Sequence, residues 1–251
     1  MNERPSSSLR RSGESRTALV TGASAGIGQA IVHQLLARGW GVIGVSRDPA
    51  RGAFTHTAYR GLALDLGDLD SLEERLRALP KELPPIDTLV LCAGRGLVAG
   101  LGEMSYRQIR ELLDLNLTSQ ILVTRAFWPE LQRRGGDLVL MGSECALSGR
   151  REGSIYCASK FALRGFAQSL RDEGARAGLR VTLINPGPVR TPFFDQMDIE
   201  PGEAGDNALT ADDVAAATLH ALEAPRSAVV DEILLSPLKS VMRKKKRKKS
   251  P

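Results

Sequence analysis

The stretch Thr21-Gly22-Ala23-Ser24-Ala25-Gly26-Ile27-Gly28 decides the fold. It follows an apolar run of strand length at residues 17–20 and opens a stretch with helical spacing at 27–38. Glycines let the backbone turn tightly and approach a phosphate with no Cβ in the way. The helix that follows offers unpaired N–H groups to an anion. The segment therefore predicts a strand–turn–helix unit that holds a dinucleotide, although its G-x-x-x-G-x-G spacing differs from the common G-x-G-x-x-G pattern.

Seven apolar runs of strand length alternate along the chain with longer amphipathic stretches. Near-continuous apolar strands separated by helices predict a parallel sheet that is covered on both faces. We therefore expect one α/β domain over residues 16–238, doubly wound (Rossmann-type), with a seven-stranded parallel sheet flanked by helices on both faces. The expected strands are 17–20, 42–45, 62–64, 88–92, 138–141, 181–184 and 229–235, and the expected helices are 27–38, 71–79, 106–133, 154–177 and 211–224.

The formal net charge of +5 is dominated by the last residues of the chain. Arg243-Lys244-Lys245-Lys246-Arg247-Lys248-Lys249 alone contributes seven positive charges, so the remainder is mildly acidic. A nucleic-acid-binding fold would spread basic residues over a folded face, so this distribution argues against one. We expect residues 1–15 to be a disordered arm and 239–251 a disordered, solvated basic tail. Weak attachment of this tail to an anionic lipid surface or to nucleic acid is the alternative.

The sequence has no sign of export, of a membrane span or of a metal site. No stretch reaches the length of apolar residues that a spanning helix needs, and residues 1–15 lack the apolar core of a signal peptide. Cys92, Cys145 and Cys157 form no CxxC pair and no metal-ligand spacing, so we interpret them as small, reduced thiols. We therefore expect a cytoplasmic protein without a bound metal.

Three residue types that can move a proton occur at informative positions. Tyr156 and Lys160 are four residues apart on an expected helix, so their side chains share one face. A lysine ammonium favours the phenolate form of a tyrosine and lowers its pKa. Ser143 follows an expected strand, at the edge where open α/β sheets bind their ligands. Together they predict a site that protonates or deprotonates an oxygen atom.

The residues after the second expected strand bear on the choice of dinucleotide. An acidic residue there holds the free 2′-hydroxyl of NAD, whereas an arginine suits the 2′-phosphate of NADP. Arg47 comes directly after the strand and favours NADP(H), while the neighbouring Asp48 keeps NAD(H) open.

In combination, these motifs resemble the short-chain dehydrogenase/reductase family over residues 16–237. The resemblance rests on the TGxxxGxG loop, on Tyr156-x-x-x-Lys160 with Ser143 thirteen residues upstream, and on the Pro186-Gly187 turn. It implies that the tyrosine is the general acid/base and that the serine orients the substrate oxygen. It also implies that the lysine binds the nicotinamide ribose and lowers the tyrosine pKa. Asn116 resembles the family's fourth catalytic residue, which holds a water that links the lysine to solvent.

The resemblance also implies a cofactor-binding set and an oligomer. Asp65 resembles the residue that contacts adenine, and the segment from Pro186 to Thr191 resembles the one that meets the carboxamide. A homodimer or homotetramer is implied, packed through the helices at 106–133 and 154–177. Cys92 departs from the family's usual asparagine, for which we expect a local packing change. The implied cofactor residues are Thr21, Gly22, Ser24, Gly26, Ile27, Gly28, Arg47, Asp65, Leu66, Ala93, Gly94, Tyr156, Lys160, Pro186, Gly187, Val189 and Thr191.

The segment after Thr191 resembles the family's variable substrate lid. Phe193, Phe194 and Met197 would give it an apolar surface, which favours a small, apolar carbonyl or alcohol substrate. Packing of the lid against the body of the protein is an equally good interpretation of the three residues. The acidic, glycine-containing stretch 198–207 is expected to be mobile.

The sequence therefore predicts an NADP(H)-dependent oxidoreductase that acts on a carbonyl or secondary alcohol. A non-catalytic NADP(H)-binding sensor that engages a partner through its basic tail is the alternative. The Ser/Tyr/Lys set disfavours the sensor, because a sensor does not need a proton-transferring tyrosine.

Overall fold

The computed structural model describes residues 15–245, and its centre is a parallel sheet of seven strands in the order β3-β2-β1-β4-β5-β6-β8. All six neighbouring pairs are parallel, which confirms the expected doubly wound domain. The strands are β1 (Thr17–Thr21), β2 (Gly41–Ser46), β3 (Tyr59–Ala63), β4 (Thr88–Leu91), β5 (Asp137–Met141), β6 (Arg180–Pro186) and β8 (Glu232–Leu235).

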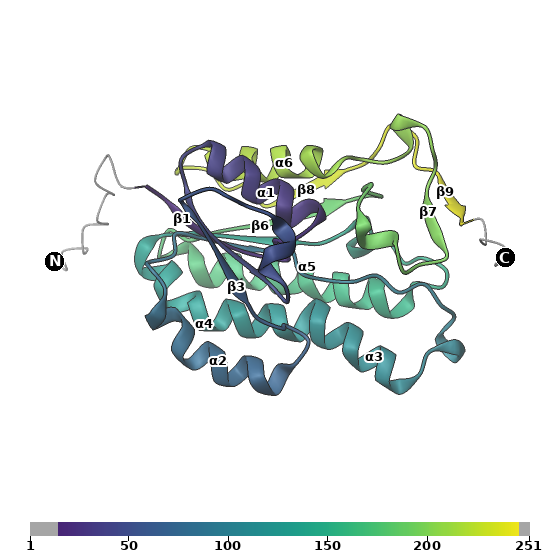
Figure 1. The fold of residues 1–251 in the computed structure, drawn as a ribbon, viewed down its shortest axis with the longest axis horizontal. Coiled ribbons are helices and arrows are strands. Elements are labelled where there is room, and N and C mark those ends of the chain that lie inside the picture. The colour runs from purple at the N-terminus through teal and green to yellow at the C-terminus, as the bar shows by residue number, and fades with distance from the viewer. Residues whose placement is uncertain (1–14, 246–251) are drawn as a thin grey trace.

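Helices cover both faces of the sheet (Figure 1). One face is covered by α1 (Gly26–Ala37) and α6 (Ala211–Glu223), which pack against each other. The other is covered by α2 (Leu69–Glu82), α4 (Ser119–Arg134) and α5 (Ser154–Ala175). Each layer has its own apolar core, and burial on both sides explains why the strand sequences lack polar alternation.

The order of the strands places a crevice at the end of β1. From β1 the chain builds outward to β2 and β3, and it then returns to place β4 on the other side of β1. Such a reversal leaves a crevice outside the carboxyl ends of the strands, where open α/β sheets bind ligands. Thr21 ties the two strand ends together, because its hydroxyl oxygen accepts hydrogen bonds at 3.1 Å from the amides of both Cys92 and Ala93.

The last helix begins as its sequence predicts. Thr210 is the N-cap of α6, and its hydroxyl accepts a hydrogen bond from the amide of Asp213 at 3.1 Å. The Asp213 carboxylate in turn accepts from the amide of Thr210 at 2.8 Å. This reciprocal pair satisfies two backbone donors that a helix end otherwise leaves open.

The long helix expected at 106–133 is interrupted. The chain forms α3 (Tyr106–Leu113), then a π-helical turn at Asp114–Thr118, and then α4. A π turn inserts one extra residue per hydrogen-bonded ring without breaking the helix, so the apolar spacing alone did not reveal it.

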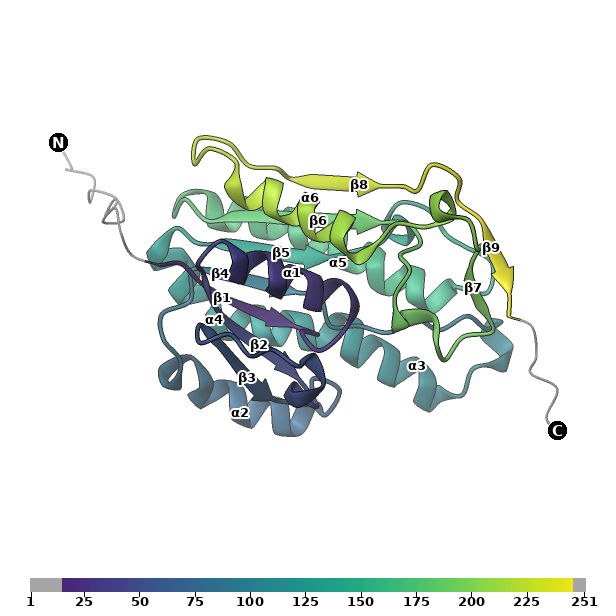
Figure 2. The same cartoon turned by 45° about the horizontal axis from the view of Figure 1, so that its top comes forward.

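The C-terminal segment differs from the expected disordered tail. Met242–Lys244 forms strand β9, which pairs in antiparallel fashion with β7 (Ile199–Pro201) from the stretch that we expected to be mobile (Figure 2). Acidic residues of this stretch form ion pairs with the first basic residues of the tail. The expected arm at 1–14 and the remainder of the tail at 246–251 lie outside the described residues. Within 15–245, no helix is both long and apolar enough to cross a membrane.

Candidate active site

The glycine loop forms a tight cradle between β1 and α1. Gly22 has φ +68°, in the left-handed region. A Cβ added to Gly28 would lie 2.3 Å from the Gly22 carbonyl oxygen, so the loop closes this tightly only with glycine there. No side chain caps the start of α1 at Ala25, which leaves the first amides of the helix to a ligand. This geometry fits the pyrophosphate of a dinucleotide.

The cradle lies beside the segment that follows β6. A Cβ built on Gly26 would lie 3.3 Å from the side chain of Thr191, so these two predicted cofactor residues face each other. Val189 is buried and forms a bridge with Leu209, and the amide of Gly187 donates to the Leu235 carbonyl at 2.7 Å. The segment after β6 is therefore fixed, on the side away from the glycine loop, by its contacts with Leu209 and with the end of β8.

The two charged residues that follow β2 have different roles. The Asp48 carboxylate accepts a hydrogen bond from the amide of Ala50 at 3.1 Å and caps the short turn Pro49–Gly52. Arg47 is exposed at the carboxyl end of the strand. The neighbouring Ser46 hydroxyl is buried and has no hydrogen-bond partner in the described part of the chain. An arginine and an open hydroxyl thus stand where the sequence places the adenosine ribose.

The other predicted cofactor residues lie at the ends of neighbouring strands. Asp65 follows β3, is exposed, and accepts a hydrogen bond from the amide of Gly67 at 2.9 Å, while Leu66 is buried. Ala93 and Gly94 follow β4, next to the glycine loop. These positions form the rim of the same crevice.

Ser143 is held at the end of β5 by a residue that the sequence analysis missed. Its amide donates to Oδ1 of the fully buried Asn185 at 3.1 Å, and its hydroxyl oxygen accepts from the amide of Cys145 at 3.2 Å. Asn185 also donates from Nδ2 to the Glu232 carboxylate at 2.5 Å, and Glu232 pairs with Arg164 of α5 at 3.0 Å. The serine is therefore fixed through a chain of contacts across β6 and β8. The only available sequence signal was the position of Asn185 directly before Pro186-Gly187.

Tyr156 lies on α5, and the direction of its pKa shift differs from our expectation. Burial raises the pKa of the Tyr156 phenol above its ordinary value, and hydrogen bonding with Ser143 opposes this only in part. Lys160 Nζ lies 5.6 Å from the centre of the Tyr156 ring. Desolvation of the phenolate is the largest influence on this pKa, so the net shift in the chain alone is upward.

Lys160 and Asn116 face the same small space beside Gly94. A Cβ on Gly94 would lie 3.2 Å from Asn116 Oδ1 and 4.0 Å from Lys160 Nζ. Asn116 is fully buried on the π turn, donates to the Arg95 carbonyl at 2.8 Å and accepts from the Arg95 amide at 2.9 Å. Lys160 donates to the Met141 carbonyl at 2.8 Å. Burial lowers the pKa of Lys160 to about 8, so this ammonium exchanges its proton near neutral pH.

Cys92 and Cys145 are poor nucleophiles. Burial raises the pKa of the Cys92 thiol to about 12 and that of Cys145 to about 11. Both thiols therefore stay protonated at neutral pH, in agreement with their interpretation as small apolar groups. Within residues 15–245, no cluster of three or more His, Cys, Asp or Glu side chains could hold a metal ion.

The predicted lid lies over the tyrosine. The ring of Phe193 is 6.1 Å from that of Tyr156, and Phe194 packs edge-on against Phe193 at 5.4 Å. Met197 lies against Gly96, where an added Cβ would be 2.0 Å from its terminal carbon. Phe193 thus lies beside the reacting group, while Met197 packs on the loop after β4.

Comparison with known proteins agrees with this geometry. The family model described as short chain dehydrogenase matches residues 16–201. A serine 3-dehydrogenase from Agrobacterium fabrum is 32% identical over 235 residues, which cover 89% of this chain and 94% of the relative. A 3-oxoacyl-[acyl-carrier-protein] reductase from Buchnera aphidicola is 33% identical over 192 residues, 74% of this chain and 78% of the relative.

Solved structures show the same fold. An alcohol dehydrogenase from the archaeon Thermococcus sibiricus, complexed with 5-hydroxy-NADP, superimposes with a TM-score of 0.79 at 27% identity, covering 88% of this chain and 96% of that one. The family match spans most of the chain, and the Ser/Tyr/Lys set lies at the crevice beside the glycine loop. The protein belongs to the short-chain dehydrogenase/reductase family of oxidoreductases.

Proposed function

We propose that the protein is an NADP(H)-dependent oxidoreductase that interconverts a small, apolar carbonyl compound and its secondary alcohol. The observation that carries the proposal is the convergence of Ser143, Tyr156 and Lys160 beside the glycine cradle. The relatives named above as dehydrogenases and reductases support the reaction class. The apolar lid over Tyr156 supports the substrate class.

In the direction of reduction, the chain's own residues bind the carbonyl oxygen and protonate it. A bound nicotinamide dinucleotide supplies the hydride. The Ser143 hydroxyl donates a hydrogen bond to the carbonyl oxygen, and its position is fixed through Asn185. Tyr156 then delivers the phenolic proton to the oxygen as negative charge develops there. Its raised pKa keeps the phenol protonated, which suits a proton donor.

The lysine and the asparagine restore that proton. Lys160 has a pKa of about 8 and therefore exchanges protons readily at neutral pH. Asn116 faces the same space beside Gly94, where a water could connect the ammonium to solvent. In the direction of oxidation, the same groups act in reverse: Tyr156 accepts the proton of the alcohol, and Lys160 passes it on.

The binding residues favour NADP(H) over NAD(H). The Asp48 carboxylate caps the turn Pro49–Gly52 through its hydrogen bond from the amide of Ala50, so part of its acceptor capacity is used within the chain. Arg47 is exposed and available to a 2′-phosphate. The Ser46 hydroxyl, buried without a partner within residues 15–245, suits a further polar contact to the same group.

A carbonyl reduction assay tests this proposal. The purified protein is mixed with NADPH or NADH and a panel of small ketones and aldehydes, and the loss of reduced-cofactor fluorescence is followed. We expect turnover that is faster with NADPH. Tyr156→Phe removes only the proton donor, so we expect a loss of 100-fold or more in kcat, the scale of general acid catalysis at about 10²–10⁴.

Tyr106→Phe is the matched control, because it removes a phenol hydroxyl from a side chain that is 88% exposed. It should leave the rate unchanged. Full activity of Tyr156→Phe would show that another group supplies the proton. Tight NADPH binding without turnover of any carbonyl would instead support the sensor.

A further inference from the structure

The end of the described chain packs along residues 198–206, which directly follow the predicted lid and which we call the lid segment. We call residues 239–245 the C-terminal strap. In the strap, β9 pairs with β7 in the register Ile199–Lys244, Glu200–Arg243 and Pro201–Met242. Two backbone hydrogen bonds extend this pairing, from the Gly202 amide to the Val241 carbonyl at 2.9 Å and from the Lys245 amide to the Asp198 carbonyl at 2.7 Å. The strap therefore follows the lid segment on both sides of β7.

Opposite charges hold the strap and the lid segment together. Arg243 binds Glu200 at 2.8 Å and also binds Glu203. At the beginning of the strap, the Lys239 ammonium pairs with the Asp206 carboxylate at 2.9 Å. Three acidic residues of the stretch that looked mobile in the sequence are thus neutralised by the strap.

Lys245 reaches the lid itself. Its ammonium donates to the carbonyl oxygens of Phe194, at 2.5 Å, and Asp195, at 2.9 Å. These carbonyls lie at the end of the short turn Pro192–Phe194, and the Phe194 carbonyl also accepts a hydrogen bond from the Met197 amide at 3.0 Å. The same turn carries Phe193, whose ring lies 6.1 Å from that of Tyr156. Lys245 is therefore one turn of backbone away from the lid residue that covers the reacting phenol.

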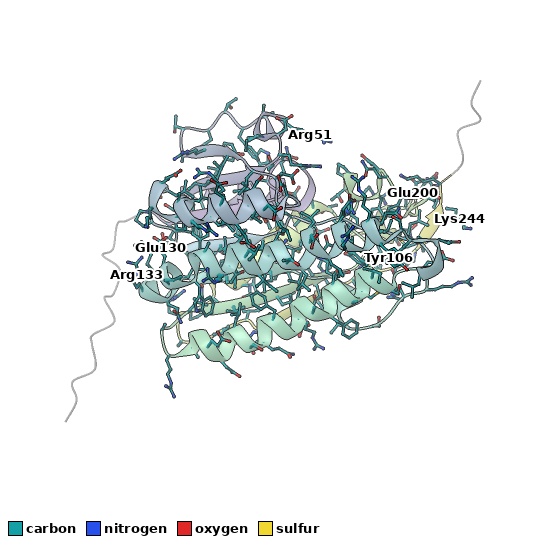
Figure 3. All side chains as sticks on the ribbon, turned by 90° about the horizontal axis from the view of Figure 1, so that it is seen from below. Arg51, Tyr106, Glu130, Arg133, Glu200 and Lys244 are labelled. Atoms are coloured by element: carbon teal, nitrogen blue, oxygen red, sulfur yellow. The ribbon has the colours of Figure 1, made fainter. Side chains whose placement is uncertain are left out.

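The side chain of Lys244, between Arg243 and Lys245, forms no hydrogen bond or ion pair with the lid segment. Alternation along a strand directs Lys244 to the opposite face from Arg243 and Lys245. Lys244 is exposed, whereas Arg243 and Lys245 are half-buried. Figure 3 shows Lys244 and Glu200 at the same end of the molecule, far from Glu130 and Arg133. Lys244 therefore offers a matched control for the two residues that touch the lid segment.

We propose that Arg243 and Lys245 are positioning residues that hold the lid closed over Tyr156 and thereby set the affinity for substrate. This proposal rests on the proposed carbonyl reduction. When the binding-competent lid is populated only in part, the apparent affinity decreases by that fraction. Chemistry after closure is unchanged, because neither residue reaches Ser143, Tyr156 or Lys160. Loosening the strap should therefore raise KM and leave kcat nearly constant.

The test measures kinetics and lid protection in the same full-length variants. In Arg243→Gln we expect KM for the carbonyl substrate to rise about two- to fivefold, the scale of a half-exposed ion pair, and in Lys245→Met, which loses two hydrogen bonds from an ammonium, at least as much; kcat should stay within about twofold in both. Lys244→Met should match the wild type. Hydrogen–deuterium exchange of the peptide spanning residues 195–204 should accelerate in the first two variants and remain unchanged in the third, without substrate or cofactor.

A charge swap separates a specific contact from a general loss of stability. Arg243→Glu places a third carboxylate beside Glu200 and Glu203, so exchange should be faster than in Arg243→Gln. Adding Glu200→Arg to Arg243→Glu should recover protection and KM.

Unchanged exchange and KM in both Arg243→Gln and Lys245→Met would overturn the proposal, as would equal effects in Lys244→Met. Lack of turnover in the wild type would refute the proposed function instead, while the exchange comparison would still test whether the strap holds the lid.

Discussion

The substitution Asn185→Asp tests the contact between Asn185 and Glu232, because it retains the shape of the buried side chain and replaces its donating NH2 group by an oxygen. Asn185 is fully buried, accepts from the Ser143 amide at 3.1 Å and donates to the Glu232 carboxylate at 2.5 Å. The introduced carboxyl can still accept from Ser143. When ionised, however, it places a second negative charge against Glu232, and Arg164, 3.0 Å from Glu232, offsets only part of this charge.

The magnitude follows from the contacts that are lost and the repulsion that replaces them. A hydrogen bond to a charged group contributes about 1.5–3 kcal/mol, and an uncompensated buried charge costs about 3–5 kcal/mol. We therefore expect the free energy of unfolding to decrease by about 3 kcal/mol or more at pH 8. Protonation of the introduced carboxyl restores a donor toward Glu232 and relieves the repulsion.

The pH dependence has a definite sign. Burial and the neighbouring carboxylate raise the pKa of the introduced group in the folded state above its unfolded value of about 3.9. Between these two values the folded protein binds more protons than the unfolded chain, so stability decreases as pH rises. The deficit of Asn185→Asp relative to the wild type should therefore be smaller at pH 5 than at pH 8.

Urea unfolding followed by circular dichroism at both pH values measures this difference. Asn185→Ala is the comparison, because it also removes the contacts to Ser143 and Glu232 but introduces no titrating group. Its deficit should not show the added pH trend. If Asn185→Asp is as stable as the wild type at pH 8, or if its deficit is equal at both pH values, the reasoning about the Asn185–Glu232 contact is wrong.

Two further predictions concern charged residues of the crevice. Arg47→Ala should raise KM for NADPH by about tenfold or more and leave KM for NADH unchanged, since a charge-assisted hydrogen bond contributes about 1.5–3 kcal/mol. Arg51→Ala, which replaces a nearby exposed arginine, is the control. Equal losses with both cofactors would contradict the assignment of Arg47 to the 2′-phosphate. Lys160 has a folded pKa of about 8, below its ordinary value of 10.5, so its desolvation destabilises the fold fully below pH 8 and less as pH rises toward 10.5. Lys160→Met should therefore raise the free energy of unfolding above that of the wild type, and this gain should be up to about 3 kcal/mol larger at pH 7 than at pH 10. Urea unfolding measures it, and Lys81→Met, which replaces an exposed lysine, should show no such pH-dependent gain.

The seven-stranded sheet could be predicted because its five inner strands, β1, β2, β4, β5 and β6, are buried on both faces. Such strands must be apolar at nearly every position, which makes them visible as runs in a single sequence. The two edge strands are the least accurate: the strand expected at 62–64 misses the first three residues of β3, and the one expected at 229–235 starts three residues before β8. Strand β8 lies at the edge of the sheet, and its Glu232 carboxylate accepts a hydrogen bond from Asn185 and forms an ion pair with Arg164.

The strap could not be predicted from local patterns. Strands β7 and β9 have three residues each and are charged, so neither has the apolar alternation that marks a strand. Their pairing depends on contacts between residues more than forty positions apart, such as Arg243 with Glu200. In the sequence, Arg243 looked like the start of a solvated basic run.

The site shows the same division between local and long-range information. Ser143, Tyr156 and Lys160 occur at recognisable spacings, and the structure brings them to the crevice next to the glycine loop. The contact that fixes Ser143 joins residues 42 positions apart, which no local pattern marks. The direction of the Tyr156 pKa shift depends on how deeply the phenol is buried and on how far it lies from the Lys160 ammonium. Neither quantity can be obtained from a four-residue spacing.

The strap brings Lys245 to the turn that carries Phe193, whereas Ser15 lies just before β1, at the opposite end of that strand from the glycine loop. Chemistry applied at these two ends should therefore have unequal consequences. A bulky fluorophore or a solid support coupled at Lys245 would remove its hydrogen bonds to Phe194 and Asp195 and press on the turn beside Tyr156. The same group coupled near Ser15 would leave that turn untouched, so immobilised or surface-tethered forms of the protein are best attached from the Ser15 end.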